Sequence, residues 1–216
     1  MDLRIITDPE LRAAAEQVVR RCIVDRLFFA TEVLGIKLEE WQADMLRDLD
    51  AGETKISVAS AIGVGKTMAV SVTGLHFLLF RDDVKVIVTS PSFNQLTDGI
   101  IPEVKKWIAR LPWWMRDQLE MTSERITRLP ETANNFMSFR TARKETPEAL
   151  QGIHATHVML LVDEASGVHD TVFEAGQGTM STAGSVAILI SNPTRVTGLF
   201  YRTHRKLKGL WKTYKV

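Results

Sequence analysis

The most informative short stretch of this 216-residue sequence is SAIGVGKT, which runs from Ser60 to Thr67. It ends like the pattern G-x-x-x-x-G-K-[ST], in which backbone N–H groups and the lysine hold nucleotide phosphates and the final hydroxyl binds Mg²⁺. Ser60 stands where the pattern has its first glycine, and serine is tolerated there if its φ angle is negative. The stretch therefore predicts a phosphate-binding loop made of Ser60, Ala61, Gly63, Val64, Gly65, Lys66 and Thr67.

A pair of carboxylates, Asp163 and Glu164, directly follows the apolar run VMLLV at 158–162. Such a run predicts a strand that is covered on both faces. Ligands of open α/β sheets bind beyond the carboxyl ends of the strands. At that edge we expect Asp163 to hold Mg²⁺ and Glu164 to act as the catalytic carboxylate that orients water, while the catalytic Lys66 reaches the β- and γ-phosphates. The two motifs together predict hydrolysis of a nucleoside triphosphate.

Two further polar motifs lie where the same site could use them. Ser191 and Asn192 follow the apolar run at 186–190, and Pro193 ends that strand. There Asn192 can reach a γ-phosphate or the attacking water, and the alternative is an ordinary turn. Upstream of the loop, Gln42 offers a donor and an acceptor that match the edge of adenine. Trp41 beside it fits a core-facing position equally well.

These residues need a scaffold of alternating strands and helices, and the sequence predicts one. Polar and apolar residues mix between 121 and 141, which indicates antiparallel strands. The alternation elsewhere indicates an α/β fold with a mainly parallel central sheet flanked by helices. The predicted strands cover 55–60, 84–89, 157–162 and 186–190, and the predicted helices cover 9–34, 39–52, 66–80, 95–111 and 169–180.

Composition and charge narrow the class of protein. The lone Cys22 excludes an internal disulfide and sits in an apolar helical pattern, so we expect an inert core thiol. No apolar run is long enough to span a membrane, and the N-terminus has no signal-peptide pattern, which indicates a cytosolic protein. The net charge of +1 conceals a basic segment, 195–216, which has seven Lys and Arg and no acidic residue. That segment predicts either contact with phosphates or acidic partners, or a solvated face that starts a linker.

With these motifs in place, residues 25–216 resemble the ATPase domain of large terminase subunits, the DNA-packaging motors of tailed bacteriophages. The resemblance implies a P-loop NTPase fold of the ASCE type, with ATP and Mg²⁺ as cofactors. It also implies that hydrolysis drives translocation of double-stranded DNA into a viral procapsid. The segments that carry it are TEVLGIKLEEWQ, SAIGVGKT, TSPSFNQL, PEALQGIHATHVMLLVDEASGV and LISNPTRVTGLF.

The resemblance also implies roles for single residues and partners. Gln42 would read adenine, Asp163 would bind Mg²⁺ through ordered water, and Glu164 would polarise the hydrolytic water. The stretch from Ser191 to Pro193 would be the motif that couples hydrolysis to movement of DNA. The implied partners are double-stranded DNA, a portal protein, a small terminase subunit and further copies in a ring, with a monomer as the alternative in solution. The implied location is the host cytoplasm, at the procapsid.

One departure from the family concerns arginine. Many members carry an arginine in the phosphate loop or just before the acidic strand, where this chain has Ile62 and Gln151. A residue elsewhere must then supply an arginine finger, which is worth about 10³-fold or more in rate. The candidates are Arg140, Arg143 and Arg195.

The second departure is length. We expect residues 1–216 to form a single ATPase domain, with the adenine motif in a helical part over 1–50. The basic segment 195–216 would lead to a nuclease domain that this chain lacks, so no nuclease activity is expected. Two alternative functions are a helicase-type motor fragment and a DNA- or portal-binding assembly module that does not hydrolyse ATP.

Overall fold

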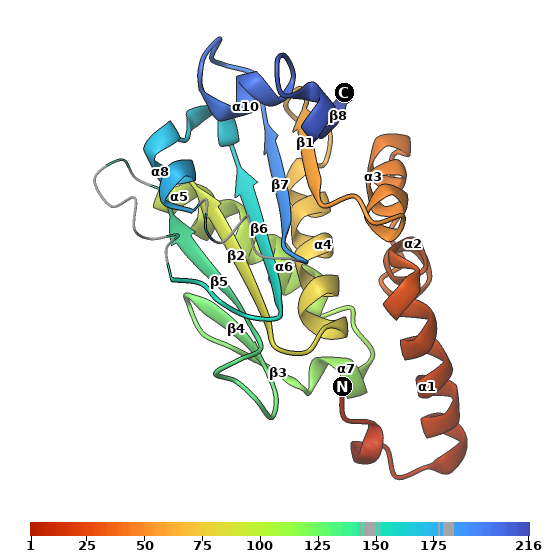
Figure 1. The fold of residues 1–216 in the computed structure, drawn as a ribbon. Helices are drawn as coiled ribbons and strands as arrows, with labels where there is room; N and C mark the ends of the chain where they lie inside the picture. Colours follow the sequence, from red (N-terminus) through yellow and green to blue (C-terminus); the bar gives the residue numbers. More distant parts are fainter. Residues whose placement is uncertain (143, 145–149, 151, 177, 179–183) are drawn as a thin grey trace.

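The computed structural model describes residues 1–142, 144, 150, 152–176, 178 and 184–216. Within those residues, eight strands form one sheet in the order β3-β4-β5-β2-β6-β7-β1-β8 (Figure 1). The strands are β1 Lys55–Ala59, β2 Val84–Ser90, β3 Leu119–Met121, β4 Arg125–Arg128, β5 Phe136–Thr141, β6 His157–Asp163, β7 Val186–Ser191 and β8 Lys212–Lys215.

The sheet is mainly parallel, as the sequence predicts. Strands β5, β2, β6, β7, β1 and β8 run parallel, and β4 and β3 extend the β5 edge in antiparallel pairing. Strand β7 separates β1 from β6, with Ala59 opposite Ser191 and Asp163 opposite Ile190. The ends of β1, β7 and β6 therefore lie level, which brings the loop after β1 and the acidic residues at the end of β6 to one edge.

Helices cover both faces of this sheet. One apolar core joins α1, α3, α4 and α6 to one face, which includes Ile56 and Leu161. A second core joins α8 and α10 to the other face, which includes Leu160 and Leu189. Figure 1 shows α10 at the end toward which the strand arrows point. The helices are α1 Pro9–Val24, α2 Arg26–Phe28, α3 Glu40–Asp50, α4 Lys66–Phe80, α5 Phe93–Gln95, α6 Ile101–Ile108, α7 Trp113–Arg116, α8 Asp170–Ala175 and α10 Gly198–Thr203.

The predicted helix over 9–34 is wrong in its second half. Helix α1 ends at Val24, and Asp25 adopts an extended conformation with φ −138°. The Asp25 carboxylate accepts a hydrogen bond from the Phe28 N–H at 2.7 Å, so it caps a new helix that continues as a π-helical turn over Phe29–Val33. An aspartate competes with helical backbone bonding in this way, which apolar periodicity alone does not reveal. The Cys22 thiol is buried as predicted, and burial raises its pKa to about 12.

Other helix boundaries also differ from the prediction. The helix expected over 95–111 starts at Phe93, because the Ser92 side chain caps it, and α6 ends at Ile108. The helix expected over 169–180 is described only as α8, and residues 177 and 179–183 lie outside the described part of the chain.

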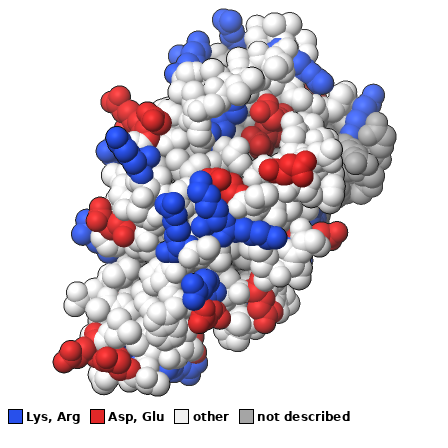
Figure 2. Space-filling model, turned by 180° about the vertical axis from the view of Figure 1, so that it is seen from behind, with Lys and Arg blue, Asp and Glu red and all other residues white. Residues whose placement is uncertain are grey.

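The basic segment 195–216 folds onto the sheet instead of forming a linker. It contains α10 and β8, and β8 pairs in parallel with β1. Arg202 pairs with Asp170 at 2.7 Å, and Lys212 pairs with Asp48 at 3.1 Å. Figure 2, seen from behind, shows basic side chains at the upper end of the molecule, where Figure 1 places α10 and β8. The remaining basic side chains of the segment therefore stand at the carboxyl edge of the sheet.

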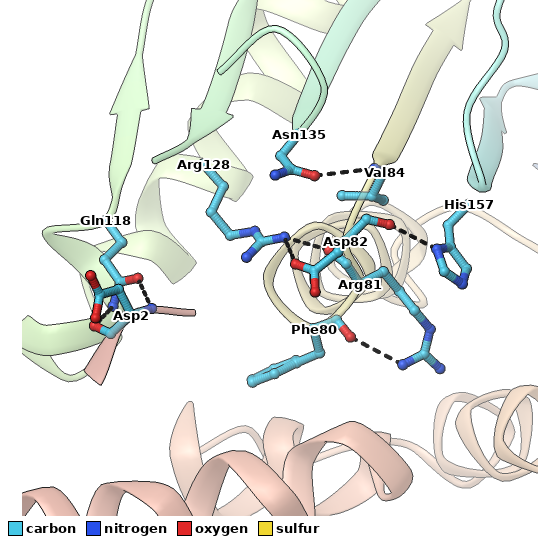
Figure 3. Close-up of polar contacts among 9 residues, drawn as sticks. All are labelled: Asp2, Phe80, Arg81, Asp82, Val84, Gln118, Arg128, Asn135 and His157. Carbon is cyan, nitrogen blue, oxygen red and sulfur yellow. Dashed lines mark hydrogen bonds and ion pairs between the residues drawn. The ribbon is translucent and has the colours of Figure 1, made fainter. Parts of the chain in front are cut away.

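A polar network closes the opposite, amino-terminal edge of the parallel strands (Figure 3). The buried Arg128 guanidinium donates to the Arg81 carbonyl and to the Asp82 carboxylate, the latter at 2.8 Å. The Asn135 side chain accepts from the N–H of Val84 at 3.2 Å. These bonds tie the turn between α4 and β2 to the β4–β5 hairpin.

Candidate nucleotide and magnesium site

The phosphate loop lies between the end of β1 at Ala59 and the start of α4 at Lys66. Its two positive φ angles belong to glycines, Gly63 at +83° and Gly65 at +81°, whereas Ser60 has no positive φ. The condition for replacing the first glycine by serine is therefore met. A loop that enters a helix N-terminus in this way presents backbone N–H groups to an anion. In this structure the Lys66 ammonium donates to the Ala61 carbonyl across the loop at 2.7 Å.

Ser60 fixes the start of the loop to the neighbouring strand. Its backbone N–H donates to the carbonyl of Ser191 at 3.1 Å, so the loop leaves β1 while still paired with β7. The side chain is 2% exposed, and its hydroxyl has no hydrogen-bond partner among the described residues. A buried hydroxyl without a partner is unfavourable, which marks this position as one that a ligand or water can complete.

Gln42 contacts the phosphate loop, which the sequence did not predict. Its Nε2 donates to the carbonyls of Val64 and Gly65, both at 3.3 Å, and its Oε1 accepts from the N–H of Glu39 at 2.9 Å. Gln42 thus links the start of α3 to the phosphate loop. A cavity of about 420 Å³ opens beside it, lined by Trp41, Gln42, Met68 and loop residues. An adenine contact by Gln42 stays a prediction.

The acidic pair sits at the carboxyl end of β6. Asp163 is 7% exposed, and its Oδ1 has no hydrogen-bond partner among the described residues. Burial, with the neighbouring Glu164 carboxylate as a smaller cause, raises the pKa of Asp163 to about 6, and Lys66 acts in the opposite direction. A desolvated carboxylate near a second carboxylate is stabilised by a divalent cation, so the donor set fits Mg²⁺. Glu164 adopts φ +50°, a strained conformation that is typical of functional sites.

Ser191, at the end of β7, joins the acidic pair to the next loop. Its hydroxyl accepts from the N–H of Ser166 at 3.1 Å, and it lies 3.2 Å from Glu164 Oε2 and 2.8 Å from the Asn192 carbonyl. The single hydroxyl hydrogen can be donated to only one of these two acceptors. Asn192 itself is half-buried and lines a cavity at this edge. Ser191 therefore lies beside Glu164, and a contact of Asn192 with the γ-phosphate or the attacking water stays a prediction.

The sequence did not predict the roles of two residues that hold the segment after β7 in place beside the acidic turn. The buried Ser166 hydroxyl accepts from the backbone N–H groups of Thr194 and Arg195 at 3.2 and 3.1 Å. The Asp170 carboxylate accepts from the N–H of Leu199 at 2.7 Å and pairs with Arg202. Both residues follow Glu164 closely in the sequence, but nothing in their spacing indicates that they hold the segment after β7.

The arginine-finger candidates lie at different distances from the phosphate loop. Arg195 follows β7 and lines the same cavity as Asn192. Arg140 is on β5, four strand positions from β1, which corresponds to about 19 Å at ~4.8 Å per strand. Arg143 lies outside the described residues.

Two other kinds of site are absent from the described part of the chain. No group of three or more His, Cys, Asp and Glu side chains in the described residues is arranged to hold a metal ion. No helix in the same residues is long and apolar enough to cross a bilayer.

The fold and the site together define the class of protein. A strand, a glycine-rich loop and a helix, with the acidic end of β6 separated from β1 by β7, form the core of a P-loop NTPase of the ASCE type. The family model described as terminase large subunit, T4likevirus-type, N-terminal, matches residues 58–203. Because this match covers more than half of the chain, the chain belongs to that terminase family.

Similar proteins support this placement. The probable large terminase subunit of Enterobacteria phage P7 is 30% identical over 183 residues, which are 82% of this chain and 37% of the relative. The chain therefore spans little more than a third of that relative.

Among solved structures, the ATPase domain of the Thermus phage P74-26 large terminase has a TM-score of 0.66 at 18% identity and covers 86% of this chain and 83% of that one. The large terminase of another thermophilic bacteriophage, solved in complex with ADP, has a TM-score of 0.56 at 12% identity and covers 92% of this chain and 44% of that one. These two likenesses show the fold.

Proposed function

We propose that this chain hydrolyses ATP with Mg²⁺ and couples the hydrolysis to movement of double-stranded DNA into a viral procapsid. One observation carries the proposal. Lys66 and Thr67 start α4 at the same edge of the sheet where Asp163 and Glu164 end β6, with only β7 between the two strands. Phosphate-binding and cation-binding groups thus meet where a nucleoside triphosphate needs both.

The residues present fit Mg²⁺ bound to ATP. The Thr67 hydroxyl and the Asp163 carboxylate would hold the ion, because Asp163 Oδ1 is buried without a partner among the described residues and its carboxylate is desolvated. The ion would neutralise charge on the β- and γ-phosphates. Lys66 would exchange its bond to the Ala61 carbonyl for phosphate oxygens.

Glu164 is the group that would orient the attacking water. Its carboxylate lies 3.2 Å from the Ser191 hydroxyl, which supports a fixed orientation of that carboxylate. Asn192, next to Ser191, would contact the γ-phosphate or the same water, and its position between β7 and the loop held by Ser166 would pass the change at the phosphate to α10.

The sheet order favours Arg195 over Arg140 for a finger that acts within the same subunit. Arg195 is fixed to the acidic turn through its backbone N–H and Ser166. Arg140 is too many strands away from β1 to reach a nucleotide held there, so it would act only on a neighbouring copy. Arg143 remains a candidate from the sequence alone.

Membership of the terminase family supports the remaining parts of the proposal. They are action on double-stranded DNA at the procapsid in the host cytoplasm, together with a portal protein, a small terminase subunit and further copies of the chain. We also propose that residues 1–216 act as one ATPase domain, because a single sheet with a core on each face runs through the described residues.

The test is ATP hydrolysis by the purified chain, with and without double-stranded DNA, over a range of protein concentrations. Lys66→Ala should lose nucleotide binding and hydrolysis. Glu164→Gln should keep nucleotide binding and lose at least about 10²-fold in rate, because it removes only the group that orients water. Matched controls are Lys206→Ala and Glu174→Gln, which change exposed side chains outside the site.

Three outcomes separate the alternatives. ATP hydrolysis that is lost in Lys66→Ala and in Glu164→Gln supports the ATPase. Hydrolysis that rises more than linearly with protein concentration indicates an arginine finger donated by a neighbouring copy. Nucleotide binding without hydrolysis, at every concentration and with DNA present, would contradict the proposal and favour a non-hydrolysing assembly module.

A further inference from the structure

A second cavity, of about 480 Å³, opens at the carboxyl edge of the sheet beside the phosphate loop. The loop after β7, helix α10 and the end of β8 form its walls, and Ser60 and Ala61 form the side next to the nucleotide site. Phe200, Tyr201 and Pro193 give it an apolar floor. The nucleotide site shares Ser60, Ala61, Asn192 and Arg195 with this cavity, but it does not include Arg205 or Lys215.

The two cavities lie on opposite faces of the sheet. Trp41, Gln42 and Met68 line the first cavity, and they belong to α3 and α4 on the face that includes Ile56. Ala59 and Phe200 line the second cavity, and they pack in the core on the other face. The phosphate loop lies between them, with Gly63 to Gly65 lining the first cavity and Ser60 and Ala61 lining the second, and Val216 lines both.

The second cavity is lined by positive charge without negative side chains. Arg195, Arg205 and Lys215 line it, no Asp or Glu side chain of the described residues does, and none of the three cations has an ion pair among those residues. Two other cations of the same segment, Arg202 and Lys212, do have carboxylate partners. Of the five cations of this segment that have no ion pair among the described residues, three therefore line the cavity, which favours an anion there.

Buried polar atoms without partners also line this cavity. Ser60 is 2% exposed and its hydroxyl has no partner among the described residues, so it can donate to an anion. His204 bonds to the phosphate-loop strand through a chain of three groups. The Thr203 hydroxyl donates to the Phe200 carbonyl at 2.7 Å, and the Ser57 and Thr203 hydroxyl oxygens share a hydrogen bond of 2.7 Å.

His204 also contacts this strand directly, because its Nε2 lies 3.0 Å from Ser57 Oγ, within hydrogen-bond distance. The other ring nitrogen, Nδ1, is buried without a partner in the described part of the chain. A wall of the cavity is thereby bonded directly to the strand that carries the phosphate loop.

We propose that this cavity is a second anion site, which binds a phosphate group on the α10 face of the sheet beside the nucleotide site, through Arg205 and Lys215. Arginine and lysine at the rim and a buried hydroxyl donor match the oxygens of a phosphate group. Free inorganic phosphate and the phosphates of a DNA backbone share this chemistry. The experiment distinguishes the two sources.

The experiment measures binding to the full chain without nucleotide. Calorimetric titration with inorganic phosphate forms one arm, and fluorescence anisotropy of a labelled DNA duplex over a salt series forms the other. The variants are Arg205→Ala, Lys215→Ala and their combination. We expect about a tenfold loss of affinity for each cation removed, because a hydrogen bond to a charged group is typically worth about one tenfold step or more.

Three controls make the result specific. Lys206→Ala removes the same charge one residue from Arg205 but does not line the cavity, so its loss should be less than about threefold. Arg205→Lys keeps the charge and should restore most of the affinity. Lys66→Ala disables the nucleotide site and should leave binding at this cavity unchanged, which separates this proposal from the proposed ATPase. Thermal melting of each variant verifies that it is folded.

Loss of phosphate affinity in the Arg205 and Lys215 variants, with Lys66→Ala unaffected, assigns the site to inorganic phosphate. If only DNA binding responds, with the salt slope lowered by about 1 for each variant, the ligand is a backbone phosphate. The proposal is overturned if binding is lost only in Lys66→Ala, or if Lys206→Ala loses as much affinity as Arg205→Ala. It is also overturned if the Arg205 and Lys215 variants bind both phosphate and DNA as tightly as the unchanged chain.

Discussion

The two ends of the parallel strands differ in how completely their polar side chains are paired. At the amino-terminal end, the side chains of Arg128, Asn135 and His157 bond to the turns beside them (Figure 3). Arg128 Nε is the exception there, without a partner among the described residues. At the carboxyl-terminal end, Ser60 Oγ and Asp163 Oδ1 lack partners in the same part of the chain.

The two ends also differ in how a residue with a strained backbone conformation is supported. Within the described residues, two non-glycine residues have positive φ, Asp83 at +46° and Glu164 at +50°, one at each end of the sheet. The Asp83 carboxylate accepts two hydrogen bonds from Thr156, both at 2.6 Å, so the strained turn is held by the protein itself. The Glu164 turn stands beside Asp163, whose Oδ1 has no such partner among the described residues. One end is thus completed by the protein, and the other is left for a ligand to complete.

The largest expected effect on stability comes from Arg128. Arg128→Ala should lower the free energy of unfolding by about 3 kcal/mol, because a buried side chain that bonds two turn groups is lost. Urea denaturation measures this. Arg116→Ala, which breaks the exposed pair with Asp117, should change it by less than about 0.5 kcal/mol. Equal effects would show that the amino-terminal network does not stabilise the fold.

Asp163→Asn should act in the opposite direction. Burial raises the pKa of Asp163 from 3.8 to about 6, so the folded protein binds the proton more tightly and loses stability as the pH rises through that interval. Asparagine removes the buried charge, and the variant should be more stable by about 2 kcal/mol near pH 7. The gain should vanish below about pH 4, where Asp163 is protonated in both the folded and the unfolded protein. Denaturation at both pH values checks this, and a gain independent of pH would contradict it.

Two glycines of the phosphate loop offer a matched pair. A Cβ on Gly65 would lie 2.4 Å from Gln42 Nε2, whereas a Cβ on Gly63 would meet nothing within 4 Å, and both have positive φ. Gly65→Ala should therefore cost about 1 kcal/mol more than Gly63→Ala, since only the former displaces Gln42 from the loop. Thermal unfolding of both variants measures the difference, and in a Gln42→Ala background it should disappear.

The smallest expected effect is at the strained amino-terminal turn. Thr156→Val removes the hydroxyl bond to Asp83 and keeps the backbone N–H bond, so the cost should be about 0.5 kcal/mol. Thr156→Ser keeps the hydroxyl and serves as the control. If Thr156→Val cost as much as Arg128→Ala, the turn and not the arginine would be the main support of this end.

The sequence predicted the strands well and some helix ends poorly. Apolar runs such as those of β6 and β7 are long enough to indicate buried parallel strands, and their observed bounds differ from the predicted ones by one residue. The helix over 9–34 was overextended, because the capping bond from Asp25 to Phe28 competes with apolar periodicity. Strand β8 was missed, because a short basic segment shows no strand pattern until β1 lies beside it.

The sequence by itself determined which residue types stand at the strand ends where chemistry is predicted: the loop SAIGVGKT, the carboxylates Asp163 and Glu164, and the polar residues after β7. Residue type and local spacing are sufficient for this, because each motif occupies one strand end and the turn that follows. Only the tertiary structure decided what surrounds them. It turned Gln42 toward the loop, held Arg195 through Ser166 and left Asp163 Oδ1 without a partner among the described residues. These contacts join segments far apart in the chain, and long-range packing leaves no local pattern from which they could be predicted.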